Sequence, residues 1–149
     1  MSVDVAPEIV IFRPRAAVAA YMFDPRNDAN WTSGVIESRP LQEGRLGKGS
    51  RVERISKFLG RRFGYTYEVV QADDDRLVEM SVTKPFPMQI RYELEDVPQG
   101  TLVRIRARGQ AGSFFRVAAP LLGAMVKRNI SNDLGLLKQR LEAAVATTD

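Results

Sequence analysis

The most regular pattern of apolar residues lies near the C-terminus, from about Ala118 to Ala146. Apolar side chains recur there every three or four positions, which places them on one face of a helix with polar side chains opposite. The apolar positions are Leu122, Val126, Ile130, Leu134, Leu137, Leu141 and Val145. Such a helix is roughly 40 Å long at about 1.5 Å per residue, and no upstream segment predicts a helix that could cover it. We therefore expect a broad sheet to cover its buried face.

A second pattern, the alternation of apolar and polar residues, runs from Ser50 to Gly109 and predicts consecutive strands. The predicted segments are Arg51–Leu59, Arg62–Gln71, about Val78–Thr83, about Met88–Glu95 and about Val103–Arg108. Another strand is expected to begin at Val35. Because no helical pattern separates these segments, they predict an antiparallel meander with one buried face and one face in water.

The N-terminal part predicts a first strand, Val5–Phe12, followed by two short helices. Pro14 suits the first turn of a helix over Arg15–Phe23. Asp24-Pro25 is a helix start signal, with Asp as the cap and Pro at the first helical position, and the second helix should reach Trp31. Residues 1–149 therefore predict one α+β domain: a curved antiparallel sheet of about six to seven strands wrapped around a long C-terminal helix.

Gly60-Arg61 suits a two-residue hairpin loop that pairs Leu59 with Arg62. That loop would place Arg54 on the inner face of the sheet, opposite Tyr67. An inward guanidinium is costly unless it is paired. We therefore expect Arg54 either to pair with Asp133 of the last helix or to stay available to the head group of an acidic amphipathic ligand. The alternative is that both side chains reach solvent at the edges of the cavity.

The first half of the last helix has a wider apolar arc than the second half, because Leu121 and Met125 extend it. This asymmetry suits a helix that is anchored by its C-terminal half and lines a cavity with its N-terminal half. Loose packing against Phe114 and Phe115 would explain it equally well.

Composition narrows the chemistry that the chain can perform. It has 149 residues with neither Cys nor His, which excludes a thiol nucleophile, a disulfide, an imidazole base and the usual zinc ligands. Acid–base chemistry would fall to carboxylates, Tyr, Lys or Arg. Since no nucleotide-binding glycine pattern is present either, we expect neither a metal nor a cofactor.

The formal net charge is +4, with a basic series at Arg104, Arg106 and Arg108. Glu93 and Glu95 are expected across the hairpin, and opposite charges there complete a solvated face. Binding of single-stranded nucleic acid would require aromatic residues between the arginines, and none is present. We therefore expect no nucleic-acid partner.

No signal peptide pattern follows Met1, and the longest apolar run, from Phe114 to Val126, is too short to span a bilayer. We expect a cytoplasmic location without stable membrane insertion, as a monomer or homodimer.

The order of these elements resembles the helix-grip fold of the START and birch-pollen-allergen-like (SRPBCC) superfamily. Within it, the chain is most similar to the group labelled polyketide cyclase/dehydrase and lipid transport. The motifs that carry the resemblance are Asp24-Pro25-Arg26-Asn27 with Trp31, Gly47-Lys48-Gly49, Tyr65-Thr66-Tyr67-Glu68-Val69, Gly100-Thr101, and Leu137-Lys138 with Leu141-Glu142. The resemblance implies a hydrophobic cavity with Trp31 at its mouth but no fixed catalytic set. Enzyme branches place His or paired acids in this cavity, and the chain has no His.

We expect the cavity to bind a hydrophobic or amphipathic small molecule, as in a carrier or sensor, and we predict no catalytic residues. The alternatives are a metal-free cyclase or dehydratase that uses cavity Tyr, Arg or Asp side chains, and a protein-interaction module that acts through its outer surface. Trp31 would equally well be a core residue, and core positions with hydrogen bonds to the backbone are the favoured interpretation for the tyrosines. The predicted ligand-binding residues are Trp31, Arg54, Phe58, Phe63, Tyr65, Tyr67, Met80, Tyr92, Leu122, Met125, Asn129 and Asp133.

Overall fold

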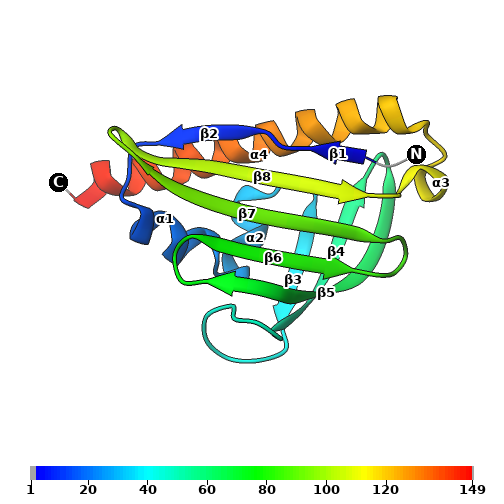
Figure 1. The fold of residues 1–149 in the computed structure, drawn as a ribbon, viewed down its shortest axis with the longest axis horizontal. Helices are drawn as coiled ribbons and strands as arrows, with labels where there is room; N and C mark the ends of the chain where they lie inside the picture. Colours follow the sequence, from blue (N-terminus) through cyan, green and yellow to red (C-terminus); the bar gives the residue numbers. More distant parts are fainter. Residues whose placement is uncertain (1–2, 149) are drawn as a thin grey trace.

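Six consecutive strands form the antiparallel meander that the alternating pattern predicts. A computed structural model describes residues 3–148, and the side chains of residues 3–143. Each strand pairs with the next along the chain, and the sheet curves (Figure 1). The strands are β3 (Val35–Pro40), β4 (Arg51–Phe58), β5 (Arg61–Asp73), β6 (Leu77–Val82), β7 (Met88–Val97) and β8 (Gly100–Gly109).

The predicted first strand enters the sheet as two pieces, β1 (Val3–Val5) and β2 (Glu8–Ile11), which both pair antiparallel with β8. Pro7 separates them because it has no N–H to donate to the ladder. Its carbonyl still accepts a hydrogen bond from the Ile105 amide, at 3.1 Å. The split raises the sheet to eight strands, in the order β1-β8-β7-β6-β5-β4-β3 with β2 also on β8.

Two short helices follow β2, as predicted: α1 (Arg15–Met22) and α2 (Asp28–Trp31), joined by a 3₁₀ turn η1 (Pro25–Asn27). The Asp24 carboxylate caps η1 by accepting from the Arg26 amide at 3.0 Å. A further short helix, α3 (Gly112–Phe115), follows β8 and was not predicted. Its two phenylalanines, Phe114 and Phe115, pack against Phe63 at the end of the sheet.

The long helix α4 (Ala119–Thr148) matches the predicted range closely and runs beside β1 and β2 (Figure 1). Its C-terminal half packs into a solid core: Leu134, Leu137 and Leu141 are buried against residues of α1 and the sheet. The Arg13 guanidinium donates to the Leu141 carbonyl, at 2.6 Å, and fixes this end. Val145, which the pattern also places on the buried face, lies outside the described side chains.

The turn between β4 and β5 differs by one position from the prediction. Phe58 pairs with Arg61, so the loop residues are Leu59 and Gly60, both with positive φ (52° and 77°), as a type I′ turn requires. Arg54 therefore pairs with Tyr65 and not with Tyr67. The predicted faces survive the change because a two-residue loop at either position keeps the same parity.

The outer face of the sheet is covered by ion pairs around the basic series. Arg104 pairs with Glu8 and Glu93, and Arg106 pairs with Asp4. Glu93 is thus a partner, as expected, whereas Glu95 lies opposite Leu102 in the register. The described residues include no helix long and apolar enough to cross a bilayer.

Candidate functional site

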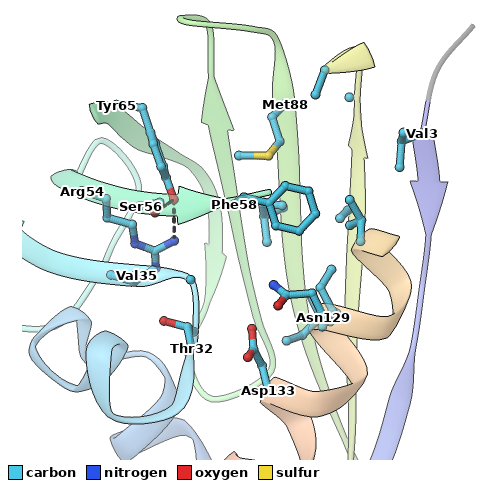
Figure 2. A pocket seen from close by; sticks show the side chains of 18 of the residues that line it. Val3, Thr32, Val35, Arg54, Ser56, Phe58, Tyr65, Met88, Asn129 and Asp133 are labelled. Carbon is cyan, nitrogen blue, oxygen red and sulfur yellow. Dashed lines mark hydrogen bonds between the residues drawn. The ribbon is translucent and has the colours of Figure 1, made fainter. Parts of the chain in front are cut away.

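A cavity of about 190 Å³ lies between the sheet and the N-terminal half of α4. This volume far exceeds the roughly 10–15 Å³ that one water molecule needs. Its walls are mainly apolar, including Met88 and Ile90 of β7, Leu122 and Val126 of α4, and Ile105 of β8. Polar side chains reach it from two opposite sides (Figure 2).

Five phenylalanines close the end of the cavity near the β4–β5 turn. Their ring centroids lie 4.9–5.8 Å apart, mostly in tilted or edge-to-face pairs. The cluster consists of Phe58, Phe63, Phe86, Phe114 and Phe115. Arg61 covers it from outside, with its guanidinium 3.7 Å from the Phe114 ring centroid. Packed aromatic rings of this kind form a rigid apolar surface. This end of the cavity can therefore contact the apolar part of a ligand.

A buried ion pair forms one polar side of the cavity. Arg54 donates from Nε and Nη2 to Oδ2 of Asp28, at 3.1 and 2.7 Å. The two side chains are only 7% and 2% exposed. Ser38 Oγ also donates to Asp28 Oδ2, at 2.8 Å. Asp28 therefore sits behind Arg54, and the predicted pairing of Arg54 with Asp133 is wrong.

Three tyrosines surround the Arg54 guanidinium. Nη1 lies 3.4 Å from the Tyr65 hydroxyl, and the guanidinium lies 4.6 Å from the Tyr67 ring centroid. Burial disfavours the charged form of Arg54, but Asp28 and the tyrosines outweigh that effect and hold its pKa well above the ordinary value. Burial also raises the pKa of Tyr92 to about 12 and that of Tyr67 further. The guanidinium stays charged and these phenols stay neutral.

Asp133 and Asn129 form the other polar side, on the cavity face of α4 (Figure 2). Ser33 donates to Asp133 Oδ1 from its amide at 3.0 Å and from its hydroxyl at 2.8 Å. The Ser33 hydroxyl also lies 3.3 Å from Asn129 Oδ1. Burial raises the pKa of Asp133, and the two Ser33 hydrogen bonds offset only part of that rise. The Ser33 hydrogen bonds thus fix the Asp133 carboxyl group at the cavity wall.

Trp31 lines the cavity from the end of α2 and is 1% exposed. Its ring contacts Tyr92, with centroids 5.8 Å apart. The indole Nε1 is buried and has no hydrogen-bond partner among the residues that the structure describes. Trp31 is thus both a core residue and a wall of the cavity.

The structure brings nine of the twelve predicted ligand-binding residues to the cavity wall. They are Trp31, Arg54, Phe58, Phe63, Tyr65, Tyr92, Leu122, Asn129 and Asp133. The other three do not line it. Tyr67 and Met80 are on the inner face, but they belong to the solid core. Met125 falls to one side of the arc of α4 that faces the cavity, and Leu121 is 56% exposed, so neither widens the cavity face.

Several site residues were missed from sequence. Asp28 lies three positions before Trp31, hence on the same face of a short helix, and this spacing was the available signal. Ser33 and Phe86 lie in loops, where neither period-two nor period-3.6 patterns mark the residues that contact a site. Within the described part of the chain, no group of three His, Cys, Asp or Glu side chains is placed to hold a metal ion.

Comparisons with solved structures identify the fold. The Zhui aromatase/cyclase from Streptomyces sp. R1128 is 17% identical with a TM-score of 0.80, over 97% of this chain and 96% of that one. A START superfamily protein from Mycobacterium smegmatis is 13% identical with a TM-score of 0.78, over 96% and 98%. A protein from Thermus thermophilus is 16% identical with a TM-score of 0.76, over 97% and 99%.

These identities are low, so the likeness shows the helix-grip fold alone. A comparison with curated proteins found no match. A match to a family in sequence is more specific, since it covers residues 2–142, nearly the whole chain. The chain therefore belongs to the polyketide cyclase/dehydrase and lipid transport family.

Proposed function

We propose that the protein binds a hydrophobic or amphipathic small molecule in the cavity between the sheet and α4, as a carrier or sensor. One observation carries this proposal: the N-terminal half of α4 faces a space of about 190 Å³ where its C-terminal half faces packed side chains. Small-molecule sites are typically concave and mostly apolar, with a few placed polar groups. The cavity has that composition, with polar groups on two sides only.

Fluorescence of Trp31 offers a direct test, because it is the only tryptophan of the chain and lines the cavity. We expect the neutral probe N-phenyl-1-naphthylamine to bind saturably at one site, with quenching of Trp31 and enhancement of the probe. Trp31→Phe is the control: it should abolish the protein signal while calorimetry still detects binding. A folded protein that does not bind the probe would refute the carrier proposal.

Native mass spectrometry of the freshly purified protein extends the test to the natural ligand. We expect a fraction of the protein to carry a small molecule that organic extraction removes. The recovered molecule should then compete with the fluorescent probe. A copurifying molecule that fails to displace the probe would place its binding outside the cavity.

A cyclase or dehydratase activity is the second candidate, and Asp133 is the observation that favours it. A carboxyl group with a raised pKa beside an apolar cavity has the properties of a general acid or base. Similarity to the Zhui aromatase/cyclase adds support at the level of the fold. Incubating the recovered molecule with the protein distinguishes the two candidates. An enzyme would release one water or create a new aromatic absorbance, and Asp133→Asn would abolish the change.

A further inference from the structure

The buried cation at the cavity, Arg54, is already paired with a carboxylate and is not available to bind an anionic ligand. Four charged residues lie along the cavity: Arg54, Asp133, Lys57 and Arg108. Arg54 is the one deeply buried cation among them, and Asp28 already takes its Nε and Nη2 donors. The pair as a whole is neutral. Together with the neighbouring Tyr65, this side of the cavity offers N–H donors and a hydroxyl group but no net positive charge.

The opposite side of the cavity carries the Asp133 carboxyl group, which is negatively charged in its ionised form. Asp133 is 7% exposed, and both hydrogen bonds from Ser33 reach the same oxygen, Oδ1. Oδ2 receives no hydrogen bond from a described residue, and Figure 2 shows the carboxyl group directed toward the open space. This side therefore offers an acceptor. A second anion next to it would meet like-charge repulsion at low dielectric.

The side chains of the two remaining cations lie on the outer face of the sheet, because Lys57 and Arg108 follow the inward residues Ser56 and Ala107. Lys57 is exposed, and the Arg108 side chain is 39% exposed, bonds to Gln89 at 2.9 Å and pairs with Glu79 at 3.6 Å. Solvent and salt screen charges in such positions. They can hold an acidic group only outside the cavity, so they do not offset the negative charge of Asp133 within it.

We propose that the cavity selects an uncharged ligand with a rigid apolar body, a carbonyl-type acceptor directed to Arg54 and Tyr65, and a hydroxyl donor directed to Asp133. This assignment rests on the proposed binding function and adds the chemical class of the ligand. It replaces the acidic amphipath expected from sequence, because Asp28 neutralises the arginine that was to receive the acid. An ionised head group would lose its hydration without gaining a partner charge.

Two naphthalene probes of nearly equal size test the proposal. 6-Hydroxy-2-naphthaldehyde carries an acceptor and a hydroxyl at opposite ends, and 6-hydroxy-2-naphthoate replaces the aldehyde with a carboxylate. Calorimetry near neutral pH gives the dissociation constant of each. We expect the aldehyde to bind at least about tenfold more tightly, the scale of one charge-assisted contact.

Asp133→Asn tests the assigned donor side, because Asn keeps an oxygen for Ser33 and removes only the charge and the acceptor. The aldehyde should weaken and the carboxylate should not, so the ratio of their affinities should fall toward one. Asp74→Asn is the matched control: it removes the same charge in the β5–β6 turn, away from the cavity, and should leave the ratio unchanged.

Each other outcome is decisive. Equal or tighter binding of the carboxylate by the unmodified protein would overturn the ligand class while leaving the binding function intact. A preference for the aldehyde that survives Asp133→Asn would overturn the role of Asp133 and with it the proposal. If the folded protein bound neither probe, the proposed binding function itself would be refuted.

Discussion

At the scale of single residues, the buried Arg54–Asp28 pair should be sensitive to the loss of either partner. Removing one partner of a buried pair leaves an uncompensated charge, at a cost of about 3–5 kcal/mol. We expect Asp28→Asn and Arg54→Met each to lower the free energy of unfolding by that amount, measured by urea denaturation. The double variant Asp28→Asn/Arg54→Met should recover part of the loss.

Arg39→Met is the matched control, on the neighbouring strand β3. Its partner Glu53 lies 3.6 Å away, and both side chains are largely exposed, at 69% and 45%. Exposed pairs contribute at most about 1 kcal/mol. If Arg39→Met destabilised the protein as much as Arg54→Met, burial would not be the reason for the sensitivity of Arg54.

Asp133 should make stability depend on pH. Its pKa is raised in the folded state above the ordinary value of 3.8, so the folded protein binds the proton more tightly than the unfolded chain. The contribution of Asp133 to stability is therefore fully present at acidic pH and is lost as pH rises from about that value through the folded pKa. Asp133→Asn should remove this loss, matching the unmodified protein in acid and exceeding it at neutral pH. Parallel urea titrations across pH would show identical profiles if Asp133 did not contribute.

Sequence reasoning reached Arg54 but not its partner, and the reason is physical. The alternation along β4 together with a two-residue loop determines which face a residue occupies, and this combination predicted an inward Arg54. Asp28 reaches it only because η1 and α2 are folded against β3, where Ser38 bonds the same carboxylate. Tertiary docking of this kind leaves no periodic signal in the sequence.

At the scale of elements, the β4–β5 turn shows both the strength and the limit of pattern reading. The pair Gly60-Arg61 suits a hairpin loop with Gly first, whereas the observed loop is Leu59-Gly60. The closing pair is therefore Phe58–Arg61 in place of Leu59–Arg62, and Leu59 adopts φ 52° in the loop. A non-glycine residue in that conformation costs about 1–2 kcal/mol, and the sequence rules for turns place glycine where they can avoid that cost.

Substitutions in this turn should have opposite effects on stability. Leu59→Asn should raise the free energy of unfolding by about 0.5–1 kcal/mol, because Asn tolerates positive φ and Asn-Gly is a favoured type I′ pair. Gly60→Ala should lower it by about 1–2 kcal/mol, because φ is 77° there. The midpoints of urea unfolding measure both changes. A stabilising Gly60→Ala would contradict the turn geometry.

At the scale of the whole molecule, the two halves of α4 have different roles. The helix, its length and its buried face followed from the period of its apolar residues. The division between a solid C-terminal half and an N-terminal half beside a cavity was expected as well, although from Leu121 and Met125, which do not line it. Val126 and Ile130 of α4 border the cavity, whereas Leu134 and Leu137 of the same buried face belong to the core. The period of the apolar residues is the same in both halves, so it does not distinguish a cavity wall from a packed core.

Substitutions in the two halves should separate stability from binding. Leu137→Ala, at a fully buried core position, should cost about 2–5 kcal/mol in unfolding free energy and leave the affinity for N-phenyl-1-naphthylamine within about twofold. Val126→Phe should instead fill empty space, preserve stability and weaken the probe by at least about tenfold. Thermal unfolding and fluorescence titration measure the two effects. If Val126→Phe destabilised the protein as strongly as Leu137→Ala, its side chain would have met packed atoms. The N-terminal half of α4 would then cover a core and not a binding site.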